Sequence, residues 1–208
     1  MPLLLAAALV LGSVTAFADG EPAAPETTET TEITSEETAG TWSGDTYTDN
    51  QGIVYKLNGD GTITLTGGTG GTSATGAITI PDAIEKGEES YPVTRVGGSA
   101  FYDCDALEKV TFSGNIDSIG DSAFWDCDGL KTVTFSGNVG SIGDTAFFGC
   151  YQLNTVTFSG KVGSIGDTAF GFCDALENVT FFGGVHSIRY YAFQGCGALN
   201  TVTFSGNV

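Results

Sequence analysis

The sequence predicts an α/β repeat solenoid made of 23-residue repeats, with an N-terminal β-hairpin cap. The first observation is the spacing of the five cysteines, which is 23 residues every time: Cys104, Cys127, Cys150, Cys173 and Cys196. The second is that their surroundings recur without a gap, as in IGDTAFFGCYQLNTVTFSGKVGS at 142–164. The third is that each copy contains a helical hydrophobic period and then a strand period. A fixed period in this range is typical of solenoids, because one repeat cannot bury its core alone.

The amino-terminal segment predicts an export signal. Residues 2–12 form an apolar run that is too short for a stable membrane anchor, and 16–18 read Ala-Phe-Ala, a small-x-small cleavage site. We therefore expect 1–18 to be a secretory signal peptide that is cleaved before Asp19. No Lys or Arg precedes the run, which indicates either an atypical signal or a start upstream of Met1. No later segment is apolar enough to span a membrane, so we expect no membrane insertion of the mature chain.

Residues 19–40 are rich in Thr and Glu and contain seven acidic residues and no basic one. Such a segment cannot bury enough apolar surface to offset its ordering entropy. We expect a disordered, self-repelling linker. A calcium-binding function would need ligands at fixed offsets around a turn, which this segment does not offer.

Residues 41–95 show β signals and precede the repeats. Two alternating runs within 53–67 flank Asn58-Gly59-Asp60-Gly61, which is a hairpin pattern. The same four residues could be read as a calcium loop, but no later acid stands at the required spacing. The sequence therefore favours a plain turn here.

Residues 96–208 hold five repeats, the last incomplete. In the copy at 142–164, one face at helical spacing is apolar: Ile142, Ala146, Phe147, Cys150 and Leu153. Asp144 is the predicted N-cap of this short helix, and Val156-Thr157-Phe158 then alternates as a short strand does. The chain stops at Val208 within a repeat and without a polar cap, so we expect it to be part of a longer protein.

The phrase I-G-x-x-A-F-x-x-C-x-x-L-x-x-V-x-F, as in 142–158, resembles the BspA-like (treponemal-type) leucine-rich repeat. The resemblance covers about 96–208. It implies a curved solenoid on a secreted or surface-exposed protein, with a β segment such as 41–95 covering its first end. Some members of the family are adhesins for host matrix proteins. The family has no fixed binding motif, so the resemblance implies no ligand residue.

Composition argues against several function classes. Seven Lys and Arg stand against 25 Asp and Glu, which gives a net charge of −18. Binding of nucleic acids or of anionic membranes depends on cationic side chains, so neither is expected. His186 is the one histidine and has no nucleophile at a recognisable spacing, and the paired acids beside the cysteines fit a solvated edge. We expect no enzyme, no cofactor and no metal site.

The cysteines allow two interpretations. Export favours disulfides, and stacked repeats would place neighbouring Cα atoms about 5 Å apart, within bonding range. However, the number is odd and every cysteine occupies a predicted core position. We favour five buried free thiols that pack as small apolar groups.

Three surfaces are candidates for binding a partner. The first is a polar strand face with a threonine in every repeat, which also fits simple strand propensity. The second is the position after each Ala-Phe pair, occupied by Tyr102, Trp125 and Phe148. The third is a local break in the repeat, where five larger residues replace small or acidic ones: Phe182, His186, Arg189, Tyr190 and Tyr191. Sequence drift is the simpler explanation of this break, although Tyr and Arg are frequent in binding hot spots.

These observations lead to an expected function. We expect a secreted or cell-surface, non-catalytic solenoid that binds an extracellular protein, as an adhesin for host matrix does. The alternative is a targeting or glycan-binding module of a larger secreted enzyme. A pure spacer is a third possibility.

Overall fold

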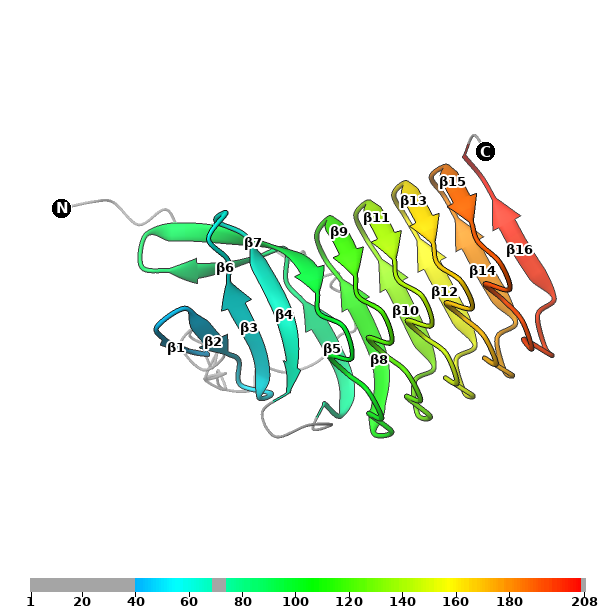
Figure 1. Ribbon diagram of the computed structural model, residues 1–208, viewed down its shortest axis with the longest axis horizontal. Coiled ribbons are helices and arrows are strands. Elements are labelled where there is room, and N and C mark those ends of the chain that lie inside the picture. The colour runs from blue at the N-terminus through cyan, green and yellow to red at the C-terminus, as the bar shows by residue number, and fades with distance from the viewer. Residues whose placement is uncertain (1–39, 69–73, 207–208) are drawn as a thin grey trace, which may run out of the picture. The chain divides into compact units, whose positions relative to one another are not determined.

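The computed structural model describes residues 40–68 and 74–206, which form sixteen β-strands and no helix (Figure 1). The α/β prediction is therefore wrong in its helical part, and the described chain is a parallel β-solenoid. The predicted signal peptide at 1–18 and nearly all of the predicted linker at 19–40 lie outside the described residues.

Each 23-residue turn contributes one strand to each of two sheets. The first sheet contains the predicted Val-x-Phe strands: β8 (Leu107–Phe112), β10 (Thr132–Phe135), β12 (Thr155–Phe158), β14 (Asn178–Phe181) and β16 (Thr201–Phe204). The second contains strands that the sequence did not predict: β9 (Ile116–Ile119), β11 (Val139–Ile142), β13 (Val162–Ile165) and β15 (Val185–Ile188). Successive strands pair parallel and in register across one repeat, as in Val133 with Val156 and Val139 with Val162.

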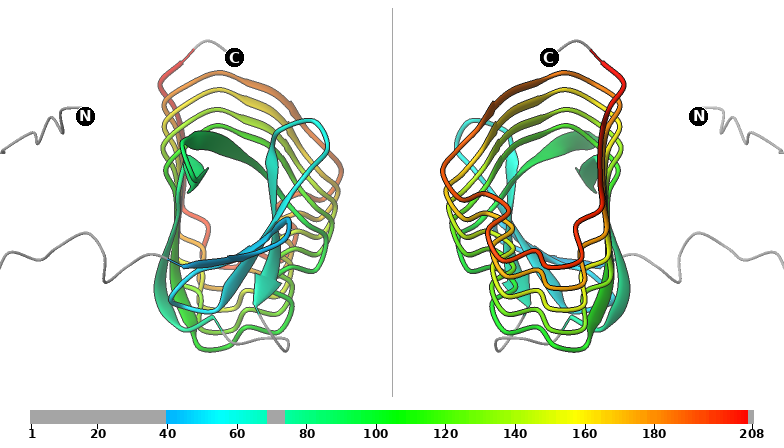
Figure 2. Two further views of the ribbon diagram at one scale, coloured as in Figure 1. Left: turned by 90° about the vertical axis from the view of Figure 1, so that its left-hand side faces the viewer. Right: turned by 90° about the vertical axis from the view of Figure 1, so that its right-hand side faces the viewer.

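The segment before the repeats extends both sheets. Its strands are β1 (Thr41–Ser43), β2 (Thr46–Thr48), β3 (Ile53–Leu57), β4 (Ile63–Gly68), β5 (Gly76–Ile80), β6 (Ala83–Lys86) and β7 (Glu89–Val96). β3 and β4 form the predicted antiparallel hairpin. β4 pairs with β7 and β7 with β9, whereas β5 pairs with β8. Figure 2 looks along the coil, and β1 to β4 lie at its first end.

Two ladders of phenylalanine fill the core. One runs from Phe101 to Phe193 and the other from Phe112 to Phe204, each with one ring per turn. Ring centroids within a ladder lie 4.7–5.3 Å apart, and most ring planes are nearly parallel. Each such pair stabilises by about 0.5–1.5 kcal/mol beyond the burial of its apolar area. The predicted core positions of Ala, Phe, Cys, Leu and Val are buried in the inner turns.

The segment predicted as a helix is a series of turns for two physical reasons. Thr145 and Gly149 both have positive φ, at 55° and 72°, and the matching residues of the other turns are also left-handed. In addition, the amides of Thr145, Phe147 and Gly149 donate to carbonyls of the next turn at 2.7–2.9 Å. An α-helix would need those N–H groups for bonds along its own axis. Hydrogen bonds between successive turns therefore take the place of the hydrogen bonds that a helix would make within itself.

Asx side chains reinforce the stack. The Asp121 Oδ1 atom accepts from the amide of Asp144, the Asp144 Oδ1 from that of Asp167, and the Asp167 Oδ1 from that of Tyr190, at 2.8–3.1 Å. Asp144 is therefore part of a ladder between turns and is not the cap of a helix. These bonds hold the loops after β9, β11 and β13 at the same spacing as the strands.

Candidate functional site

Four aromatic side chains stack along the outside of the solenoid. Tyr102 and Trp125 have centroids 6.3 Å apart, Trp125 and Phe148 4.5 Å, and Phe148 and Phe172 5.3 Å. We call these four residues the aromatic column. Tyr102 is 46% exposed and Phe172 41%, whereas Trp125 and Phe148 are half-buried. The structure thus brings together three residues that the sequence predicted and adds Phe172.

Phe172 belongs to the aromatic column although it stands one residue later in its turn than Phe148 does in the preceding turn. Gly171 occupies the place that follows Ala-Phe, and a Cβ atom there would lie 3.0 Å from the Phe148 ring. Phe172 adopts a φ of 55° at a position that is Asp or Gly in the other turns. A bulky residue in the left-handed region is strained, so the backbone carries strain where the column ends.

The geometry of the aromatic column determines what it can bind. Tyr102 and Trp125 lie at 16° to one another and Trp125 and Phe148 at 26°, so these rings are roughly parallel, and Trp125 and Phe148, 4.5 Å apart, cover one face of each other. Ring edges and the outer rings remain accessible. Sugars stack on free aromatic faces, whereas a protein surface can pack against a strip of edges.

All five predicted side chains of the repeat break are exposed, and four of them lie in the loop after β15 or directly after β14. Tyr190 is 79% exposed, Tyr191 71% and Phe182 56%. The Arg189 guanidinium lies 4.0 Å from Asp144 and 3.9 Å from Asp167, next to the aspartate ladder. Exposed ion pairs of this kind stabilise weakly, so Arg189 mainly offsets the repulsion between stacked carboxylates.

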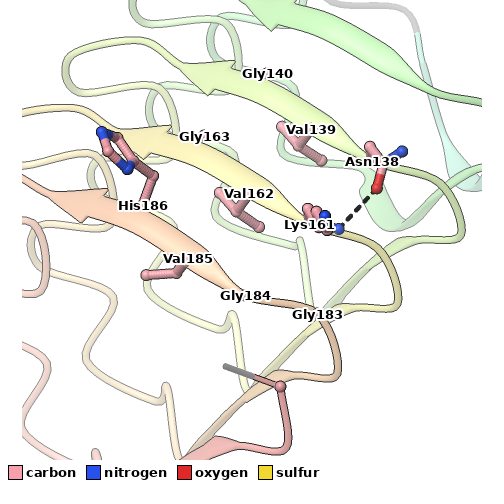
Figure 3. Close-up of a pocket in the computed structure, with 11 residues that line it drawn as sticks. Asn138, Val139, Gly140, Lys161, Val162, Gly163, Gly183, Gly184, Val185 and His186 are labelled. Atoms are coloured by element: carbon pink, nitrogen blue, oxygen red, sulfur yellow. Dashed lines mark hydrogen bonds between the residues drawn. The ribbon is translucent and has the colours of Figure 1, made fainter. Parts of the chain in front are cut away.

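His186, the fifth predicted residue, lies apart from the tyrosines on β15. It lines a shallow groove of about 750 Å³ together with Lys161, Asn138 and several glycines (Figure 3). Gly140 and Gly163 precede His186 in the same column of the sheet, and a Cβ atom on either would approach the preceding turn's carbonyl oxygen to 2.4 Å or less. At these two turns close packing of the strands favours glycine, which leaves a flat floor beside Lys161 and His186.

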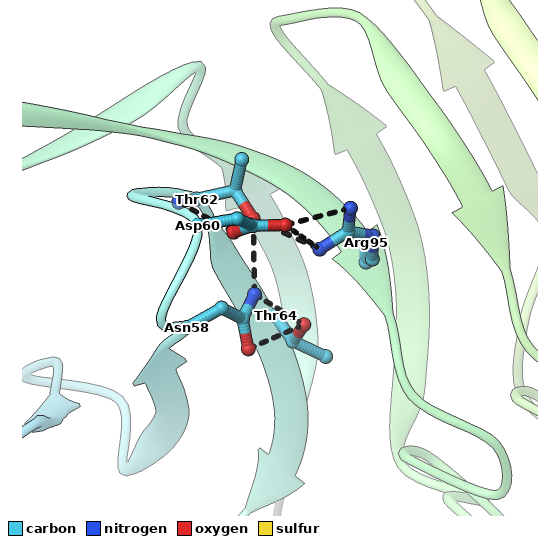
Figure 4. Close-up of polar contacts among 5 residues, drawn as sticks. All are labelled: Asn58, Asp60, Thr62, Thr64 and Arg95. Atoms are coloured by element: carbon cyan, nitrogen blue, oxygen red, sulfur yellow. Dashed lines mark hydrogen bonds and ion pairs between the residues drawn. The ribbon is translucent and has the colours of Figure 1, made fainter.

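The turn between β3 and β4 is a closed polar network. Asp60 accepts from both Arg95 Nη atoms at 3.1 Å and from the Thr62 amide and hydroxyl, while Asn58 bonds Thr62 and Thr64 (Figure 4). The Thr62 hydrogen bonds, followed by Arg95, lower the pKa of Asp60. The network ties the hairpin to β7, which agrees with the predicted turn.

The thiols lie in a column as the sequence predicted, and all five cysteines are free. Four are buried and Cys196 is partly exposed. Four of the Sγ atoms approach a phenylalanine carbonyl of the preceding turn, as Cys150 approaches Phe124 at 3.1 Å. Burial raises the pKa of Cys150 well above the ordinary thiol value, so these thiols behave as core groups.

Within residues 40–68 and 74–206, no group of three or more His, Cys, Asp and Glu is placed to hold a metal ion. The same residues contain no helix that could cross a membrane.

Comparison with known families agrees with this geometry. Residues 94–208 match the family described as the BspA type leucine rich repeat region, in six copies. The chain belongs to this family.

Solved structures place the BspA-type repeat of this chain among bacterial proteins. The T. pallidum leucine-rich repeat protein is 28% identical with a TM-score of 0.60, and the match covers 74% of this chain and 69% of that one. A Bacteroides ovatus leucine-rich repeat protein (24% identical, TM-score 0.51) and the pneumococcal vaccine antigen PcpA (21%, 0.50) share the fold. The matches cover 72% and 80% of this chain but only 45% and 49% of theirs. No curated protein matches.

Two features of this BspA-type chain were missed by sequence reasoning. One is Phe172, although the exchange of Phe-Gly at 148–149 for Gly-Phe at 171–172 was a visible signal. The other is a pocket lined by Trp42 and Tyr47 in the segment before the repeats. Its walls come from strands far apart in sequence, so no local pattern reveals it.

Proposed function

We propose that this BspA-type chain is a secreted or cell-surface, non-catalytic protein that binds extracellular proteins, as an adhesin for host matrix does. The aromatic column is the observation that carries the proposal. It offers a continuous aromatic strip about four turns long on the outside of the solenoid. Single buried aromatic anchors can contribute about 2 kcal/mol or more to binding. The predicted export signal and the membership of the repeat family support the location.

The segment 41–95 is, in this proposal, the β cap of the solenoid. Its strands pair with the first strands of both sheets, and the ion pair between Asp60 and Arg95 fixes the hairpin to β7. A capped first end keeps that sheet edge from pairing with other chains. The aromatic column then begins at Tyr102, in the first turn after the cap.

Charge defines the class of partner. With a net charge of −18 the chain repels acidic proteins, so the partner is a basic or neutral protein. Electrostatic attraction acts mainly on the association rate and is screened by salt. Binding should therefore weaken from low to physiological ionic strength, while the aromatic contribution remains.

The experiment measures binding of the chain to a panel of matrix proteins and glycans, with two variants. Trp125→Ala removes the centre of the aromatic column, and Tyr190→Ala removes the most exposed ring of the repeat break. Circular dichroism confirms that each variant is folded. Loss of protein binding in the folded Trp125→Ala chain supports the column. Unchanged binding in both folded variants rejects both aromatic sites and leaves the threonine face as the candidate.

The alternative is a glycan-binding or targeting module of a larger secreted enzyme. The groove at His186 favours it, because its flat glycine floor could accept a sugar ring beside the Asn138 amide. His186→Ala separates the two functions. Binding to glycans alone, lost in this variant and retained in Trp125→Ala, would replace the protein-binding proposal.

A further inference from the structure

A second cavity lies in the segment before the repeats. It measures about 470 Å³, is open to solvent, and is lined by residues between Gly40 and Tyr55 and by residues between Thr79 and Glu85. This volume is within the range of small-molecule sites and is ample for a single side chain. The cavity lies outside the aromatic column and outside the groove at His186.

Aromatic rings form the walls of this pocket. Trp42 and Tyr47 have centroids 5.4 Å apart with their planes at 50°, and Tyr47 and Tyr55 lie 5.9 Å apart at 53°. These rings meet at an angle instead of lying parallel, and Trp42 and Tyr47 are half-buried, so part of each remains accessible to a ligand. The Trp42 indole N–H donates to the carbonyl of Glu85 at 2.8 Å, and the Tyr47 hydroxyl accepts from the Gly40 amide. The walls are therefore held in place before any ligand arrives.

The pocket contains a fixed carboxylate. Asp49 Oδ1 accepts from the amides of Gln51 and Ile53 at 2.9 and 2.8 Å. Its Oδ2 receives only a long hydrogen bond, 3.4 Å, from the hydroxyl of buried Tyr55. Burial, followed by the neighbouring Asp49 charge, raises the pKa of Tyr55, so this phenol stays protonated. Asp49 Oδ2 is thus able to accept a stronger bond from a ligand.

The charge of the lining favours one chemistry. Asp49 and Glu85 both line the cavity, and none of its lining residues is Lys, Arg or His. Trp42 already interacts with a cation, since the Lys86 Nζ lies 4.7 Å from its ring centroid. That ammonium is occupied elsewhere, because it also donates to the Gly44 carbonyl and to Asp45. Aromatic faces beside a carboxylate form a strong combination for binding a cation.

We propose that this pocket binds the ammonium or guanidinium group of a lysine or arginine side chain on the partner protein. The cationic head would bond Asp49 Oδ2, and its stem would pack against the Trp42 and Tyr47 rings, which contact each other. That the side chain belongs to a partner protein rests on the proposed function. The preference of the pocket for a cation can be tested without any partner. The aromatic column would then bury apolar area of the partner protein, and the pocket would select a basic residue on it.

The test uses Trp42 fluorescence. Trp42 and Trp125 are the two tryptophans of the chain, so Trp125→Phe leaves Trp42 as the reporter. The probes are N-acetyl-argininamide, N-acetyl-lysinamide, the uncharged citrulline analogue and methyl glucoside. We expect a saturable change with arginine and lysine probes, with a Kd on the order of millimolar for an isolated side chain, and none with citrulline or the sugar.

Two variants locate the binding. Asp49→Asn should weaken binding of the arginine probe by about tenfold, the loss expected for a charge-assisted hydrogen bond. Asp117→Asn, an exposed acid on β9, makes the same change in net charge and should leave the Kd within about twofold. Calorimetric titration of Trp42→Leu, which needs no fluorescence, should show no binding of the arginine probe, and circular dichroism checks the folding of each variant.

Three results would overturn the pocket assignment. They are the absence of saturable binding by either cation, citrulline or sugar binding as tightly as arginine, and equal effects of the two Asp→Asn variants. These outcomes differ from a failure of the proposed function. If no protein of the panel binds but the arginine probe does, the pocket stands and the protein-binding role is wrong. If proteins bind through the aromatic column and no cation binds, only the pocket is wrong.

Discussion

The ring of Phe172 meets the ring of Phe148 edge to face, 5.3 Å away at 62°, although Phe172 is one position out of step with the repeat. Gly171 makes room for this contact, and the left-handed backbone at Phe172 redirects its side chain toward the preceding turn. Phe172 thereby supplies the fourth ring of the aromatic column in a turn where the expected position is Gly171. This is the structural reason for testing the column as one surface.

The first prediction concerns backbone strain at Tyr191. This residue has a φ of 55° and a side chain that is 71% exposed, so its ring makes few contacts that could offset the strain. Tyr191→Asn should raise the free energy of unfolding by about 1 kcal/mol, because Asn tolerates the left-handed region. Tyr190→Asn is the matched control, since Tyr190 does not have a positive φ, and should change stability by about 0.5 kcal/mol or less. Urea denaturation measures both, and a destabilised Tyr191→Asn would contradict the strain.

The second prediction concerns the glycine column in the turn between the two sheets. A Cβ atom on Gly160 would lie 2.6 Å from the Gly137 backbone, and strands hold both turns in place. Gly160→Ala should lower stability by about 1–3 kcal/mol through overpacking. At Gly59 a Cβ atom meets nothing within 4 Å, so Gly59→Ala should be nearly neutral. Equal melting temperatures for the two variants would refute the steric account.

The third prediction concerns the phenylalanine ladders. Phe158 is fully buried and stacks at 4.8 Å on both Phe135 and Phe181. Phe158→Ala should cost about 3–5 kcal/mol of stability, since it leaves a cavity and removes two stacking contacts. Phe182→Ala, at an exposed position, should cost about 0.5 kcal/mol or less. Chemical denaturation of both variants provides the comparison.

The fourth prediction concerns thiol reactivity. A hydrogen bond from the Cys173 side chain lowers the pKa of the partly exposed Cys196, whereas burial raises the pKa of Cys150. The thiolate is the reactive form, so near pH 8 Cys196 should react first with a disulfide reagent in the native protein. Its rate should also level off at a lower pH than that of an unfolded cysteine. In denaturant without reductant all five thiols should titrate, and a total of one or three would reveal disulfides.

Much of the fold could be predicted from spacing alone. Positions such as Phe147, Val156 and Phe158 are buried as expected, because a strict period forces equivalent side chains into the same layer of the core. The helix could not be excluded from the sequence, since a turn with two left-handed residues also points apolar groups inward at intervals of three or four. The strand at Val162–Ile165 was missed because its Gly-Ser centre has weak strand propensity, which the ladder overrides.

The candidate site was less predictable than the fold. Tyr102, Trp125 and Phe148 follow from the repeat, but the angles between their rings depend on the packing of successive turns. The pocket beside Trp42 needs β1, β3 and the β5–β6 connection to meet, and such long-range pairing leaves no mark in a local pattern. In the sequence Arg189 is visible only as a departure from the repeat. Its proximity to Asp144 and Asp167 depends on how successive turns stack.

The hydrogen bonds between turns also set the response of the molecule to tension. They point along the coil, so a pull that separates its two ends loads them directly and detaches turns one by one from an end. A detached turn of 23 residues stretches to about 75–80 Å, against the spacing of about 5 Å that it occupied in the stack. A solenoid of this kind between a surface and a moving partner would lengthen in steps and keep its remaining turns folded.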